Sequence, residues 1–193
     1  MRVLCLGDSN TYGFDPRSYF GGRYPEKDRW VNILAQKTGW QVQNAGENGL
    51  EIPHRAYDLC VYCQFVSSCL PLDRVVVMLG YNDLLQGAEV PEVLARMERF
   101  LEALPVAREK ILLVAPPLMR LGPWVTEERT LAASRELNRR YRPLAQRMGT
   151  AFADAGQWNI ELTYDNVHFS EAGHRAFAEG IYPALLNMTP PAE

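Results

Sequence analysis

The sequence predicts an α/β fold, in which a three-layer α/β/α sandwich surrounds a five-stranded parallel sheet. Short apolar runs alternate along the chain with longer segments of helical periodicity, as in repeated strand–helix units. Most of the apolar runs are followed by Gly, Asn, Asp or Pro. With 193 residues, of which 47% are hydrophobic and 22% charged, the chain has the length and composition of a single domain spanning residues 1–193.

Five segments are predicted to be strands. The first four are short and mostly apolar, which suits strands that helices cover on both faces. The fifth is only weakly apolar, and it still lies in the expected place between two helical segments. The predicted strands are residues 2–6, 40–44, 74–79, 110–115 and 150–154.

Helical periodicity marks the segments between these strands and after the last one. The predicted helices are residues 29–37, 53–69, 91–104, 127–148 and 171–186. Around the third helix the apolar residues recur at steps of three and four, which predicts a stripe packed into the core rather than a cofactor site. That stripe consists of Val90, Val93, Leu94, Met97, Leu101 and Leu104.

Charge and hydropathy argue against several classes of partner. The 20 basic and 23 acidic residues give a net charge of −3, so no basic excess is present to hold a nucleic acid backbone. The apolar start at residues 3–6 is too short for a signal peptide, and no segment is long and apolar enough to span a membrane. We therefore expect a cytoplasmic protein, and the sequence leaves open whether it forms a homo-oligomer.

The four cysteines pose a separate question, because Cys60 and Cys63 form a CxxC motif with Cys69 nearby. A zinc site needs four ligands, whereas this region offers three thiols on one predicted helix and His54 before it. We expect reduced, buried structural thiols and no metal. The sequence assigns the cluster no further role.

Small and polar residues are concentrated where the predicted strands end. Three such segments are residues 7–10 (GDSN), 44–49 (NAGENG) and 80–83 (GYND). A fourth polar segment, residues 165–168 (DNVH), lies before the last helix. Sites in open parallel sheets form at the carboxyl ends of the strands. We therefore expect these four blocks to meet.

The first and last blocks contain the residue types of nucleophilic catalysis. A serine hydroxyl needs a base within hydrogen-bond reach, and imidazole, with a pKa of about 6.5, suits that role. A carboxylate on the other ring nitrogen fixes the tautomer of the base. We predict Ser9 as nucleophile, His168 as base and Asp165 as its partner, in preference to the histidines and acids at other positions. Those others are His54, His174, Asp8 and Asp83, the two acids being predicted to shape loops.

Together the four blocks resemble the SGNH (GDSL-like) hydrolase family, whose four letters correspond to Ser9, Gly49, Asn82 and His168. The resemblance extends from Val3 to about Ile181. It implies a flavodoxin-like sheet and an oxyanion hole built from the N–H groups of Ser9 and Gly49 and the side-chain amide of Asn82. Leu50 follows Gly49 where the family usually has a small polar residue, which keeps Gly46 as an alternative to Gly49.

Residues 28–30, 68–73 and 77–83 resemble a bacterial arylesterase and acyltransferase subgroup more closely. By that resemblance Tyr12 and Phe14 border the substrate pocket, with core packing as the other interpretation of both rings. Trp124, in the Pro-rich loop after the fourth strand, is a further candidate for the pocket.

We therefore expect a serine esterase that hydrolyses short-chain aryl or alkyl carboxylic esters through an acyl-enzyme on Ser9, without a cofactor. Acyl transfer to an alcohol is a variant of the same reaction. The alternatives are a carbohydrate O-deacetylase, an acyl-CoA thioesterase and a non-enzymatic, flavodoxin-like module that binds a small ligand. The loop after the first strand lacks the P-loop and GxGxxG patterns, and the chain has no GxSxG motif of α/β-hydrolases.

Overall fold

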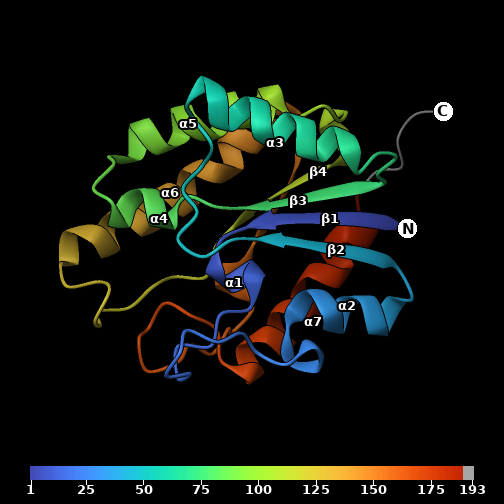
Figure 1. The fold of residues 1–193 in the computed structure, drawn as a ribbon. Coiled ribbons are helices and arrows are strands. Elements are labelled where there is room, and N and C mark those ends of the chain that lie inside the picture. The colour runs from blue at the N-terminus through green and yellow to red at the C-terminus, as the bar shows by residue number, and fades with distance from the viewer. Residues whose placement is uncertain (189–193) are drawn as a thin grey trace.

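The computed structural model describes residues 1–188 and contains a five-stranded sheet in which every neighbouring pair of strands is parallel (Figure 1). The strand order is β2-β1-β3-β4-β5, the flavodoxin-like order. The predicted fold class is confirmed. The strands are β1 (Arg2–Gly7), β2 (Gln41–Gly46), β3 (Arg74–Met78), β4 (Ile111–Ala115) and β5 (Ala151–Asp154).

Helices cover both faces of the sheet and make the three layers (Figure 1). Alternate residues of the central strands point to opposite faces, so Leu4 and Leu6 pack on one side while Val3 and Cys5 pack on the other. The first side is covered by α3 (Ala56–Ser68), α5 (Val90–Ala103) and α6 (Glu128–Met148). The second is covered by α2 (Trp30–Thr38) and α7 (Glu171–Leu186).

Two short α-helices within the described residues were not predicted. They are α1 (Ser9–Tyr12), directly after β1, and α4 (Tyr81–Leu85), close after β3. With four and five residues they are too short to show helical periodicity. Both matter for the site, because α1 begins with Ser9 and α4 contains Asn82.

The prediction that the second strand is buried on both faces is wrong. β2 lies at the edge of the sheet, and none of its six residues is fully buried. An edge strand has a neighbour on one side only, and its polar residues Gln41, Gln43 and Asn44 fit that position. The weakly apolar β5 is the opposite edge.

The cysteines differ from the expectation in one respect. Cys5 and Cys69 are buried free thiols, but Cys60 is exposed and Cys63 only partly buried. The reason is that α3 lies in an outer layer and turns Cys60 toward solvent. Residues 1–188 contain no group of three or more His, Cys, Asp and Glu side chains arranged to hold a metal ion. No helix in this same range combines the length and apolar character needed to cross a membrane.

Candidate active site

Ser9 lies where β1 ends and α1 begins. Asp8 caps this short helix, because its Oδ1 accepts a hydrogen bond of 2.9 Å from the Asn10 N–H. The turn requires glycine at position 7, since a Cβ there would lie 2.1 Å from Thr11 Oγ1. Ser9 is thereby held at the carboxyl edge of the sheet with 8% of its surface exposed.

Asp165 and His168 come from a tight turn before α7. An antiparallel bridge between Leu162 and Phe169 closes this turn, and Asn166 adopts a left-handed conformation with φ of 61°. Asp165 Oδ1 accepts hydrogen bonds from the backbone N–H groups of Val167 (3.1 Å) and His168 (3.0 Å). The three-residue spacing therefore delivers the carboxylate and the imidazole from one loop.

The structure brings the three predicted residues together in one chain of hydrogen bonds. His168 Nε2 lies 2.9 Å from Ser9 Oγ, and His168 Nδ1 lies 2.6 Å from Asp165 Oδ2. Asp165 is 1% exposed, so water does not compete for its oxygens. This is the geometry in which Ser9 Oγ–H donates to the imidazole and Nδ1–H donates to the carboxylate.

The environment of Asp165 keeps this carboxyl ionised. Burial acts to raise its pKa, but the hydrogen bonds from the ring and backbone of His168, the charge of His168 and the Val167 N–H outweigh burial. The pKa of Asp165 is consequently well below its usual range. An ionised acceptor at Nδ1 favours the tautomer whose Nε2 lone pair faces Ser9.

The other two histidines lie elsewhere. His174 is fully buried in α7, between the rings of Tyr24 and Phe169, and burial lowers its pKa to about 3, so it stays neutral. His54 faces the Ile52 carbonyl oxygen, with its Nδ1 at 2.9 Å. Of the three histidines, the structure places only His168 beside Ser9.

The two acids that were predicted to shape loops do so. Asp8 caps α1 as described above. Asp83 is completely buried and accepts hydrogen bonds from the Ile52 N–H (3.0 Å) and from Arg96 Nη1 (2.8 Å). Burial raises the pKa of Asp83, and these two donors oppose that effect. Asp83 thereby ties the segment after Gly49 to α4.

Ser9 and His168 open into a pocket of about 320 Å³. Gly49 and Asn82 also line it, whereas Gly46 does not. Asn82 Nδ2 donates one hydrogen bond to the Leu50 carbonyl (3.0 Å), which leaves the second amide hydrogen for a ligand. The N–H of Gly46 is engaged by Asn44 Oδ1 at 2.9 Å. The geometry therefore favours Gly49 over Gly46 as an oxyanion donor.

The candidate aromatic residues behave differently from one another. Phe14 lines the pocket with its ring centroid 4.8 Å from that of His168, and Trp124 lines it while 60% exposed. Tyr12 is not among the lining residues, so its predicted place is wrong. The Tyr12 ring instead packs against the Arg23 guanidinium, which lies 4.2 Å from the ring centroid.

Several lining residues were missed in the sequence. Five of them stand within the four polar blocks, where position alone was the available signal: Asp8, Asn10, Asn48, Tyr81 and Val167. Leu85 and Gln86 lie at the end of α4, where no pattern marks them. The missed lining residues are Asp8, Asn10, Asn48, Tyr81, Leu85, Gln86 and Val167.

Asn10 holds the nucleophile loop against the loop of the base. Its Nδ2 donates to the Val167 carbonyl (3.1 Å), and its Oδ1 accepts from the Phe169 N–H (2.9 Å). These two partners flank His168 in the sequence. One side chain, adjacent to Ser9, therefore fixes the backbone on both sides of the imidazole.

Replacing Asn10 with Ala is expected to lower kcat for ester hydrolysis by about 10²-fold with little change in KM, because His168 loses its position relative to Ser9. Steady-state kinetics with a p-nitrophenyl ester measures this. Asn187→Ala, an exposed site at the end of α7, is the control and should retain wild-type kcat. A kcat for Asn10→Ala within twofold of wild type would refute the positioning role.

Asp8 makes stability depend on pH. Burial raises its pKa to about 6, against the opposing effects of the Asn10 N–H and the charge of His168. The unfolded chain titrates this group near pH 4, so between about pH 4 and 6 the folded state binds more protons. Ionised Asp8 therefore destabilises the fold as pH rises through that window, by on the order of 3 kcal/mol above it.

Asp8→Asn should increase the free energy of unfolding at pH 8 by up to this amount, because asparagine keeps the capping acceptor without the charge. The gain should vanish below about pH 4, where Asp8 is protonated in both states. Urea unfolding at the two pH values tests this. A variant less stable than wild type at pH 8 would contradict it.

Comparison with known proteins places this site among ester hydrolases. The sequence profile described as the GDSL-like lipase/acylhydrolase family matches residues 5–176. The aryl esterase of M. smegmatis is 25% identical in sequence, with 97% of this chain and 99% of that one covered and a TM-score of 0.81. A carbohydrate acetylesterase from Sinorhizobium meliloti is 25% identical, with 98% and 100% covered and a TM-score of 0.82.

More distantly, a member of the lipolytic G-D-S-L family from Veillonella parvula shares the fold at 19% identity, with a TM-score of 0.75 and 97% and 99% of the two chains covered. No curated protein sequence matched the chain. The family resemblance predicted from the four polar blocks is confirmed by the profile match.

Proposed function

The chain belongs to the GDSL-like lipase/acylhydrolase family and is a carboxylic ester hydrolase, and from this premise we propose that it cleaves short-chain aryl or alkyl esters through an acyl-enzyme on Ser9. The observation that carries the proposal is the hydrogen-bonded series Ser9–His168–Asp165 at the pocket. A nucleophile, a base and an orienting group in contact are the parts that acyl transfer needs.

The first half of the reaction acylates the enzyme. Ser9 Oγ attacks the ester carbonyl carbon while His168 Nε2 takes the hydroxyl proton, and ionised Asp165 stabilises the imidazolium. The carbonyl oxygen becomes an oxyanion, for which the N–H groups of Ser9 and Gly49 and the free amide hydrogen of Asn82 are the donors. When the intermediate collapses, the C–O bond of the ester breaks and His168 protonates the departing alcohol.

The second half releases the acyl group. His168 takes a proton from a water molecule, whose oxygen attacks the acyl carbon, and Ser9 leaves with the proton returned by His168. The products are the carboxylic acid and the free enzyme. An alcohol in place of water gives acyl transfer by the same step, which is the proposed side activity.

The pocket supports a small acyl group. Its volume of about 320 Å³ is near the lower end for ligand pockets, and Phe14, Leu85 and Trp124 give it apolar walls. The name of one structural relative, a carbohydrate acetylesterase, points to a small acyl group as well, and the name of the other, an aryl esterase, points to an aryl alcohol part of the ester. The four free cysteines fit the reducing cytoplasm, which we propose as the location of the activity.

A substrate panel tests the proposed specificity. We expect kcat/KM for p-nitrophenyl acetate or butyrate to exceed that for p-nitrophenyl decanoate by roughly 10- to 100-fold, because the pocket walls exclude the long chain. Phenyl acetate, an acetylated xylose and acetyl-CoA complete the panel. A preference for decanoate would refute the short-chain proposal. Preference for the sugar acetate or for acetyl-CoA would favour the deacetylase or the thioesterase instead, and no turnover at all would favour a binding module.

A further inference from the structure

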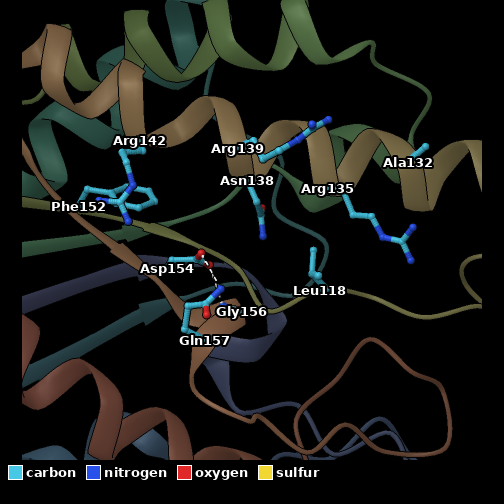
Figure 2. Close-up of a pocket in the computed structure, with 10 residues that line it drawn as sticks. All are labelled: Leu118, Ala132, Arg135, Asn138, Arg139, Arg142, Phe152, Asp154, Gly156 and Gln157. Atoms are coloured by element: carbon cyan, nitrogen blue, oxygen red, sulfur yellow. Dashed lines mark hydrogen bonds between the residues drawn. The ribbon is translucent and has the colours of Figure 1, made fainter.

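A cleft of about 700 Å³ lies between α6 and the segment that follows β5, and it is larger than the pocket at Ser9 (Figure 2). Its volume is within the usual range for small-molecule sites. None of its lining residues lines the pocket at Ser9. We propose that this cleft is a second binding site, for a small hydroxylated organic anion such as a sugar phosphate or a sugar acid.

Three arginines of α6 form one wall of the cleft: Arg135, Arg139 and Arg142. Their spacing of four and three residues places them on one face of the helix. Within residues 1–188 none of them has an ion pair or a side-chain hydrogen bond. The Arg142 guanidinium packs on the Phe152 ring, 4.6 Å from the ring centroid.

The remaining arginines of α6 are paired with acids. Arg129 lies 3.5 Å from Glu127, Arg140 lies 3.3 Å from Glu136, and Arg147 lies 3.2 Å from Glu98. The other arginines of the helix therefore have acid partners, and the three that line the cleft have none within the described residues. Guanidinium groups without acid partners are well suited to bind a carboxylate or a phosphate in a two-pronged arrangement.

Hydrogen-bond acceptors lie across the cleft from the arginines. Figure 2 shows Asp154, Gly156 and Gln157 on the segment that faces α6, with Asn138 directed from the helix toward them. Asp154 accepts from the Gly156 N–H (3.0 Å) and from Gln157 Nε2 (3.3 Å), and no cation pairs with it in the described part of the chain. Gln157 is exposed, so its side-chain oxygen is available to a ligand.

Asn138, on the wall of the cleft, has a side-chain oxygen without a hydrogen-bond donor among the described residues. The residue is 9% exposed. Its Nδ2 donates to the Pro116 carbonyl (2.6 Å), but its buried Oδ1 has no hydrogen-bond partner within residues 1–188. A buried acceptor without a donor is unfavourable, and a ligand hydroxyl that draws the amide toward the cleft would relieve this.

The arrangement selects the class of ligand. Cations on one wall require an anionic group, while the carboxylate and amide oxygens opposite require hydroxyl donors on the same molecule. Leu118, Ala132 and Phe152 supply apolar surface for a carbon ring between the two. A simple anion would leave the acceptors unmatched, and a neutral sugar would leave the arginines unmatched.

Calorimetric titration of the full chain with glucose 6-phosphate, glucuronate and glucose tests the site. We expect saturable binding of at least one of the two anions. The affinity for glucose should be weaker than the affinity for that anion by about tenfold or more. Comparing glucose 6-phosphate with glucuronate shows whether phosphate or carboxylate is the preferred group. Arg135→Ala/Arg139→Ala should weaken anion binding by about tenfold or more, since each loses charge-assisted hydrogen bonds.

The matched control is Arg140→Ala/Arg147→Ala, which also removes two positive charges from α6, at positions outside the cleft. This control should bind the anion within about twofold of wild type. The proposal is overturned if neither anion binds saturably, if glucose binds as tightly as the anions, or if Arg135→Ala/Arg139→Ala retains wild-type affinity. Equal losses in the two double variants would also overturn it, since they would report bulk charge.

Discussion

Ser9→Ala is expected to lower kcat for p-nitrophenyl acetate by on the order of 10⁶-fold, which makes it the most damaging single change. Alanine removes the oxygen that forms the acyl-enzyme, and no other hydroxyl within the described residues is recorded in contact with His168 Nε2. The oxyanion donors and the pocket remain, so a small residual rate above that of water should persist. Stopped-flow absorbance of p-nitrophenolate measures both rates.

The control for this variant is Ser67→Ala, on the exposed end of α3, which should hydrolyse the ester at the wild-type rate. Circular dichroism should show that Ser9→Ala is folded, because the substitution removes a single hydroxyl and leaves the surrounding packing in place. Turnover by Ser9→Ala close to that of wild type would exclude Ser9 as the nucleophile.

Asp165→Asn is expected to lower kcat by about 10⁴-fold with a small change in KM. The carboxylate of Asp165 accepts a hydrogen bond from Nδ1–H of His168, and its lowered pKa keeps it ionised at neutral pH. A neutral amide no longer stabilises the imidazolium, and an amide N–H facing Nδ1 favours the tautomer that places a hydrogen on Nε2. His168 could then not accept the proton of Ser9.

Asp58→Asn, which changes an acid on the surface of α3, is the matched control and should leave kcat unchanged. The pH profile gives a further readout, since the loss in Asp165→Asn should persist across the neutral range. If Asp165→Asn reduces kcat by less than about tenfold, the carboxylate does not have the orienting role assigned to it.

The layers of the fold could be predicted because buried parallel strands are nearly all apolar. Val75, Val76 and Val77 are buried on both faces of the sheet, and such runs stand out in a sequence. Edge strand β2 was less accurately predicted, because one of its sides has no neighbouring strand. The helices α1 and α4 escaped notice because neither is long enough to show a period.

The reacting residues were predictable for a different reason. Asp165 and His168 lie on one turn, so their spacing in sequence fixes their spacing in space. Contacts between segments that are distant in the sequence cannot be inferred from spacing. The sequence around Asn10 does not indicate that its side chain forms hydrogen bonds with both neighbours of His168. The contact between the Arg23 guanidinium and the Tyr12 ring is likewise visible only after folding.

The central claim is that Ser9 becomes covalently acylated, and mass spectrometry of the enzyme trapped with a fluorophosphonate ester tests it most directly. The reagent loses fluoride to an activated serine and remains bound as a stable phosphonyl ester. The account predicts one label per chain, on the peptide that contains Ser9, absent from Ser9→Ala and slowed by several orders of magnitude in Asp165→Asn. A label on another residue, or none in active wild-type enzyme, would contradict it.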